Sequence, residues 1–168
     1  MNSNLDKLSQ ITPPVIAQFL QQCDSHGFTP ILVGGAVRDL LMGADSIVDW
    51  DFELQHPQGS ESRWQALLSS LRTFGQLTPA AHHVVKGLHP DSRVEWQFAP
   101  PRLENYAPKD VYSHGDFETK VIWNQSFDEA VLRRDFTINA MGAKYSAGKW
   151  ELLDPLSGAK HLKQSSLV

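Results

Sequence analysis

The chain has 168 residues, of which 41% are hydrophobic and 20% charged, with a net charge of −4. These values are typical of one soluble globular domain, and the negative balance argues against a surface that grips RNA throughout. Any contact with nucleic acid is therefore expected to be local. No apolar run approaches the roughly 20 residues of a membrane span, and Cys23 is the single cysteine, so we expect a reducing, cytoplasmic setting.

Apolar spacing and turn residues predict the secondary structure. The expected elements, in chain order, are helices over 13–26 and 36–42 with a strand over 31–33 between them, a strand over 48–54, a helix over 60–75, strands over 82–87 and 93–99, a helix over 126–141 and a strand near 148–154. Residues 100–117 hold three prolines and no periodicity, which indicates a long loop. The mixture predicts an α+β or α/β fold with a mixed sheet of about five strands flanked by helices.

The predicted helix over 126–141 opens with a capping box, in which Ser126 precedes Glu129 by three residues. Helical spacing places Leu132, Phe136 and Ala140 on the stripe that faces the core.

Three acidic side chains project from one face of the predicted strand 48–54. Its sequence alternates, so that Asp49, Asp51 and Glu53 face away from Val48 and the other apolar residues. Same-face neighbours lie only ~7 Å apart, and their repulsion is relieved by a proton or a cation. Such a pair suits Mg²⁺, which prefers carboxylates, although a solvated acidic face explains the strand equally well. Glu95, on another alternating strand, could add a third carboxylate.

Gly34 and Gly35 join the predicted strand 31–33 to the next helix. A strand–Gly–Gly–helix junction lets the backbone approach a ligand closely and offers free N–H groups to an anion. Arg38, one turn further, could bind phosphate in a fork geometry. The alternative is a tight turn in which Arg38 pairs with Asp39 or Asp45.

Several motifs together resemble one known family. The segments are LVGGAVRDLLMG, VDWDFEL and RRDFTINAM, with APPRLE and LLDPLSGAKHLKQ in support. They resemble the catalytic head of tRNA nucleotidyltransferases (CCA-adding enzymes) and bacterial poly(A) polymerases, which are class II members of the polymerase β-like superfamily. The resemblance runs from about Pro30 to Leu162, and it implies a polymerase β-like α+β head that fills the chain from 1 to 168.

The resemblance implies roles for individual residues. Asp49 and Asp51 would hold catalytic Mg²⁺, and Glu95 matches the third acidic position. The positions expected to contact the nucleotide are Gly34, Gly35, Arg38, Arg134, Asp135 and Asn139. Arg133 and Arg134 have a plainer alternative as charges on a helix surface. Residues 100–117 match the family's flexible loop.

The implied activity is template-independent addition of CMP and AMP from CTP and ATP to tRNA 3′ ends, with pyrophosphate released by a two-metal mechanism. Two alternatives stay open, a poly(A) polymerase and a catalytically silent nucleotide-binding or regulatory domain. The family's neck, body and tail domains, which hold most of the RNA, have no counterpart in this chain. The choice between CTP and ATP therefore cannot be read from these residues.

Overall fold

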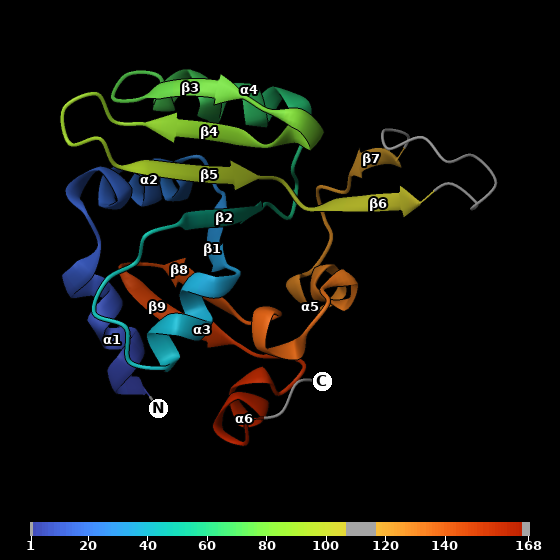
Figure 1. The fold of residues 1–168 in the computed structure, drawn as a ribbon. Coiled ribbons are helices and arrows are strands. Elements are labelled where there is room, and N and C mark those ends of the chain that lie inside the picture. The colour runs from blue at the N-terminus through green and yellow to red at the C-terminus, as the bar shows by residue number, and fades with distance from the viewer. Residues whose placement is uncertain (1, 107–116, 166–168) are drawn as a thin grey trace.

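A seven-stranded mixed sheet forms the centre of the protein, with strand order β3-β4-β5-β2-β1-β8-β9 (Figure 1). The structure is a computed structural model, and it describes residues 2–106 and 117–165. The strands of this sheet are β1 Thr29–Val33, β2 Trp50–Gln55, β3 Gln76–Pro79, β4 Val85–Leu88, β5 Glu95–Ala99, β8 Gly142–Ser146 and β9 Lys149–Leu153. β2 and β5 run parallel, whereas the other neighbouring strands pair antiparallel.

Six α-helices and three short 3₁₀ turns accompany the sheet in the described residues. They are α1 Asn2–Ile11, α2 Pro14–Ser25, α3 Gly35–Leu41, α4 Glu61–Leu71, α5 Phe127–Ala130 and α6 Gly158–Lys163, with η1 Ala81–His83, η2 Val131–Arg133 and η3 Thr137–Asn139. None of the helices in this part of the chain is long and apolar enough to cross a membrane. The predicted mixed sheet with flanking helices is confirmed, although it has seven strands instead of about five.

The main core lies between the sheet and the pair α2 and α4, which lie behind the strands in Figure 1. Phe19 of α2 packs against Phe52 of β2 and Phe98 of β5, with ring centroids 5.0 and 5.2 Å apart. Trp64 of α4 covers Phe98 at 5.6 Å. Because strand side chains alternate, the residues between these aromatics point to the opposite face of the sheet. That face carries the candidate site.

The alternation predicted for 48–54 is confirmed within β2 but fails at Val48. Trp50, Phe52 and Leu54 are buried, whereas Val48 is 85% exposed because the strand begins only at Trp50. Glu53 is 5% exposed, so the acidic face is not a uniformly solvated one.

The segment around the sequence RRDF departs from the predicted single helix. The capping box of Ser126 and Glu129 is present, but α5 spans four residues and two 3₁₀ turns follow. The backbone is extended at Arg134 (ψ 143°) and Phe136 (ψ 141°), which interrupts the helix. Leu132 is therefore 70% exposed and Phe136 is 42% exposed, and of the predicted inner stripe Ala140 is buried.

Three further elements differ from the prediction. α1 went unpredicted, although its Leu5 and Leu8 are buried in the core. The strand expected over 82–87 begins at Val85, because His82 and His83 adopt left-handed φ of 60° within η1. The expected loop over 100–117 contains a strand, β6 Arg102–Tyr106, which pairs with β7 Phe117–Val121. Residues 107–116 of that loop lie outside the described residues.

Candidate functional site

Three adjoining cavities lie on the face of the sheet opposite α2 and α4. The acidic cavity, of about 400 Å³, is lined by Asp49, Asp51, Glu95 and Gln97 among others. The arginine cavity, of about 210 Å³, shares Asp51 and Gln97 with it and adds Glu53, Arg102, Arg133 and Arg134. The glycine cavity, of about 460 Å³, shares the three arginines and adds Gly34, Gly35, Arg38, Asp135 and Asn139. Asp51 thus stands between an acidic and a basic compartment.

Asp51 is oriented by a side chain of the neighbouring strand. Gln97, its partner across the parallel pair β2 and β5, donates a 3.0 Å hydrogen bond from Nε2 to Oδ1 of Asp51. Burial raises the pKa of the Asp51 carboxyl, and the neighbouring charge of Asp49 raises it further. Asp49 directly precedes β2 and lines the same cavity. This crowding of two carboxylates favours a cation between them.

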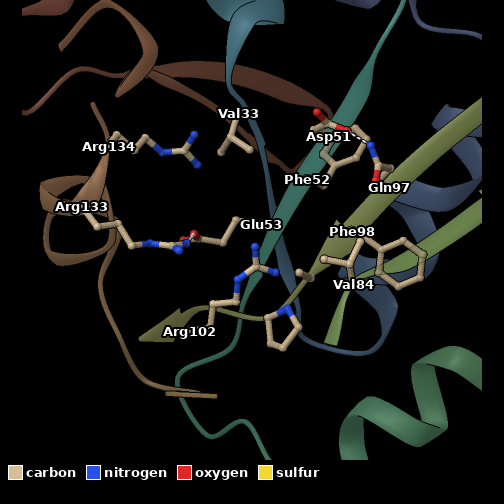
Figure 2. Close-up of a pocket in the computed structure, with 12 residues that line it drawn as sticks. Val33, Asp51, Phe52, Glu53, Val84, Gln97, Phe98, Arg102, Arg133 and Arg134 are labelled. Carbon is tan, nitrogen blue, oxygen red and sulfur yellow. Dashed lines mark hydrogen bonds and ion pairs between the residues drawn. The ribbon is translucent and has the colours of Figure 1, made fainter. Parts of the chain in front are cut away.

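Three arginines surround one buried carboxylate in the arginine cavity (Figure 2). Glu53 of β2 lies 4.0 Å from Nη2 of Arg133, and it accepts a 3.1 Å hydrogen bond from Gln55. Figure 2 shows the guanidinium groups of Arg102 and Arg133 directed at Glu53. Burial raises the pKa of Glu53, while the three arginines oppose that shift. Among the described residues, three arginines and the two carboxylates Glu53 and Asp51 line this cavity, and this positive balance suits an anionic ligand.

Arg134 supplies a second sign of an anion site. Its Nε is buried and has no hydrogen-bond partner within the described part of the chain. Burial also lowers the pKa of its guanidinium, although Glu53 opposes this effect. A buried donor without a partner destabilises the folded state, because folding removes its hydrogen bond to water without supplying another acceptor. Phosphate oxygens in the cavity would satisfy it in the fork geometry that arginine offers.

The glycine junction shapes the third cavity. Gly34 has φ 79° and ψ −150°, a backbone region that is essentially restricted to glycine. A Cβ on Gly35 would lie 3.1 Å from Nη2 of Arg38, so the second glycine lets that side chain cross close to the backbone. Arg38 donates 2.7 Å and 2.8 Å hydrogen bonds to Asn139 Oδ1 and Asp39 Oδ1. The predicted alternative of pairing with Asp39 is therefore present, whereas Asp45 pairs with Lys7.

All the site residues predicted from the sequence line these three connected cavities. Asp49, Asp51 and Glu95 meet in the acidic cavity, although Glu95 forms no ion pair within the described residues. The predicted nucleotide contacts meet in the glycine cavity, and they are Gly34, Gly35, Arg38, Arg134, Asp135 and Asn139. These residues lie far apart along the chain, so it is the fold that brings them together.

Sequence reasoning did not assign Gln97 and Arg102 to the site, and it placed Glu53 on the acidic face without a role. The alternation of 93–99 did place Gln97 on the face of Glu95, but the strand pairing that sets it beside Asp51 was not predictable. Arg102 follows β5 closely and enters the arginine cavity at the start of β6. Its Nη1 donates a 3.0 Å hydrogen bond to the carbonyl of His82.

The donor set fits Mg²⁺ bound together with a phosphate ligand. No group of three or more His, Cys, Asp or Glu side chains forms a metal-binding cluster among the described residues. The available protein ligands are therefore the two carboxylates Asp49 and Asp51. Mg²⁺ commonly takes one or two carboxylates and completes its shell with waters and substrate phosphates. Burial raises the pKa of Asp51 and the charge of Asp49 raises it further, and a cation bound between the two carboxylates would oppose both effects.

Comparison with known proteins identifies relatives and solved structures of the same fold. A CC-adding tRNA nucleotidyltransferase from Synechocystis sp. is 30% identical over 137 residues, covering 81% of this chain and 26% of that protein. A multifunctional CCA protein from Alcanivorax borkumensis is 33% identical over 133 residues, covering 79% of this chain and 28% of that protein. A solved CCA-adding enzyme in an apo form superposes with a TM-score of 0.71 at 24% identity, covering 96% of this chain and 37% of that one, which shows the fold.

The chain spans about a quarter of the length of these two relatives. Residues 31–168 match the family model described as the Poly A polymerase head domain. The resemblance read from the motifs is confirmed by that match, which covers most of the chain. This protein therefore belongs to the poly(A) polymerase head-domain family.

Proposed function

We propose that the protein is the catalytic head of a template-independent RNA nucleotidyltransferase, which adds CMP or AMP from CTP or ATP to tRNA 3′ ends in the cytoplasm. The observation that carries the proposal is the position of Asp51 between the acidic and the arginine cavities. A transfer site needs a cation-binding pair next to a pocket for the leaving pyrophosphate. The name of the Synechocystis relative, a CC-adding tRNA nucleotidyltransferase, supports the choice of tRNA as the substrate.

In this proposal the basic residues bind the phosphates and the acidic residues bind the cation. Arg134, with Arg102 and Arg133, would hold the β- and γ-phosphates in the arginine cavity. The Gly34–Gly35 backbone would let the triphosphate approach closely, and the Arg38–Asn139 pair would border the nucleotide. Asp49 and Asp51 would hold Mg²⁺, with Gln97 fixing the orientation of Asp51. Bound there, Mg²⁺ supplies a lowered pKa for the attacking hydroxyl and stabilises charge on the departing oxygens, in the proposed two-metal mechanism.

In the reaction that this arrangement serves, the RNA 3′-oxygen forms a bond to the α-phosphorus of the nucleotide. The bond from that phosphorus to the bridging oxygen breaks, pyrophosphate leaves, and the hydroxyl proton passes to solvent. Glu95 lines the acidic cavity as a third carboxylate on the side where the hydroxyl would arrive.

A poly(A) polymerase is the second candidate, favoured by the description of the matching family model. It would use the same site but would accept ATP and many RNA 3′ ends. A silent nucleotide-binding domain is a weaker candidate, because it would gain nothing from keeping the repelling pair Asp49 and Asp51.

The test is incorporation of α-labelled CTP and ATP, supplied separately with Mg²⁺. The acceptors are tRNA that lacks its terminal CCA and an unrelated RNA of equal length. Wild type is compared with Asp49→Asn and with Asp24→Asn, which removes an exposed acid on α2. Labelling of the tRNA alone, lost in Asp49→Asn and kept in Asp24→Asn, is the expected result. ATP added to both RNAs would identify a poly(A) polymerase, and nucleotide binding without transfer would overturn both enzymatic readings.

A further inference from the structure

A row of three side chains crosses the open face of the sheet at the acidic cavity. Lys86 of β4 pairs with Gln97 of β5, and Gln97 pairs with Asp51 of β2. All three side chains line the cavity. Two strand spacings separate Lys86 from Asp51, which is about 10 Å. The row therefore places a cation across the sheet from the Asp51 carboxylate, on the wall of the acidic cavity.

Arg93 adds a second cation to the same wall. It lies at the end of the turn between β4 and β5, with a left-handed φ of 59°, and lines the cavity. The turn is held by His89, whose Nδ1 accepts a 3.1 Å hydrogen bond from the backbone N–H of Ser92. The backbone N–H of Arg93 also donates 3.0 Å to the carbonyl of His89. An ordered turn thus presents Arg93 at the rim, in a conformation that is uncommon for a residue with a side chain.

Both cations are exposed and available to a ligand. Within the described residues neither Lys86 nor Arg93 forms an ion pair or a side-chain hydrogen bond, although Glu95 lines the same cavity. The chain as a whole carries a net charge of −4. Two cations that form no ion pair among the described residues therefore line the same cavity as the three acids.

The in-line geometry of phosphoryl transfer predicts which reacting group lies on each side of Asp51. Attacking and leaving oxygens lie roughly in line on opposite sides of the phosphorus. With pyrophosphate leaving into the arginine cavity, the attacking 3′-hydroxyl comes from the opposite side, which is the acidic cavity. The phosphate 5′ to the terminal nucleotide is separated from that hydroxyl by one ribose. It would then lie further along the same row, toward β4 and the turn before β5.

We propose that Lys86 and Arg93 form a subsite for the last internucleotide phosphate of the RNA primer. This inference rests on the proposed function and adds to it a place for the RNA end on this chain. The apolar residues Ile47 and Val48 also line the acidic cavity, and Val48 is 85% exposed. They would give the terminal ribose or base a surface to pack against, while the two cations hold its phosphate.

The test compares wild type with the double variant Lys86→Gln/Arg93→Gln. A matched control, Lys149→Gln/Lys160→Gln, removes two exposed cations elsewhere. The probes are a fluorescent RNA hexamer and the same RNA with a neutral methylphosphonate at its last linkage, titrated by anisotropy with Mg²⁺. Wild type should bind the natural RNA about tenfold more tightly than the methylphosphonate RNA. The double variant should bind both RNAs equally weakly, and the control should behave as wild type.

Kinetics separate the primer subsite from the nucleotide site. In the transfer assay the double variant should raise the KM for RNA about tenfold and leave the KM for CTP or ATP unchanged. Equal binding of the two RNAs by wild type would overturn the subsite, as would a rise confined to the KM for nucleotide. A wild type that transfers no label would overturn the proposed function, while the anisotropy titration would still decide the subsite.

Discussion

Gln97 holds Asp51 through a 3.0 Å hydrogen bond that crosses the parallel pair β5 and β2. The amide donates to Oδ1 of the carboxylate, and Oδ2 is the oxygen that we expect to bind a cation. Partners of this kind orient a metal-binding carboxylate and limit its rotamers. The bond also offsets part of the effect of burial on the pKa of Asp51.

Replacing Gln97 should therefore weaken the binding of Mg²⁺ without abolishing it. We expect Gln97→Leu to lower kcat by roughly 10- to 100-fold and to raise the Mg²⁺ concentration needed for half-maximal rate. Gln97→Glu should cost more, because a further carboxylate would repel Asp51. Gln76→Leu, at the exposed start of β3, is the matched control. Unchanged Mg²⁺ dependence in Gln97→Leu would show that the hydrogen bond has no part in the reaction.

Asp51→Asn should stabilise the metal-free protein. The folded state raises the pKa of this carboxyl, mainly through burial and then through Asp49, so ionised Asp51 opposes folding. The sign follows from linkage: the penalty is absent when the group is protonated in both states and grows as pH rises through the folded pKa.

The measurement is thermal unfolding in EDTA at neutral and acidic pH. At pH 7 the asparagine variant should melt about 2 °C higher than wild type, which corresponds to somewhat under 1 kcal/mol for a domain of this size. The difference should vanish as pH falls below the ordinary pKa of an aspartate, and added Mg²⁺ should also reduce it. A wild type that is more stable than the variant at pH 7 in EDTA would contradict this.

Arg134→Lys should impair nucleotide binding although it keeps the charge. The buried Nε of Arg134 lacks a partner among the described residues, and lysine cannot reproduce a guanidinium fork. We expect the KM for CTP or ATP to rise by roughly 10- to 100-fold, the worth of one or two charge-assisted hydrogen bonds. Steady-state kinetics against Arg72→Lys, an exposed site at the end of α4, would check this. Equal values of KM in the two variants would remove Arg134 from the nucleotide site.

Glu53→Gln should tighten the binding of pyrophosphate. Glu53 is an internal anion 4.0 Å from Arg133 and close to two further arginines, so it competes with phosphate for the same cations. Glutamine keeps the shape and removes the charge, and we expect roughly fivefold tighter binding. Calorimetric titration with pyrophosphate measures it, with Glu151→Gln as an exposed control. Weaker binding in Glu53→Gln would mean that the carboxylate positions the arginines instead of competing for them.

Local sequence was enough to predict the parts of the site that depend on neighbouring residues. The alternation around Asp49 and Asp51 and the glycine pair before Arg38 each describe one strand or one turn. The predicted helix over 13–26 appears as α2, because its apolar spacing matches the face that packs on the sheet. Patterns of this length need no knowledge of the strand order.

The rest depended on contacts between distant segments. The sequence predicts a solvated acid at Glu53 of β2, yet its side chain is buried. Three arginines from distant segments line the same cavity, namely Arg102 of β6 and Arg133 and Arg134 from the turns after α5. The helical spacing of Leu132 and Phe136 was misleading, since the extended backbone at Arg134 is what carries its guanidinium into the cavity. Gln97 could be placed on a face but not beside Asp51, because register is a property of two strands.

The central claim is that Asp49 and Asp51 hold a divalent cation that joins a nucleoside triphosphate. Paramagnetic resonance of Mn²⁺, titrated into the protein with CTP, tests it directly. Wild type should bind Mn²⁺ more tightly with CTP than without it, and Asp49→Asn should lose this gain while Asp24→Asn keeps it. Equal Mn²⁺ binding by wild type and Asp49→Asn in the presence of CTP would contradict the assignment of the carboxylate pair.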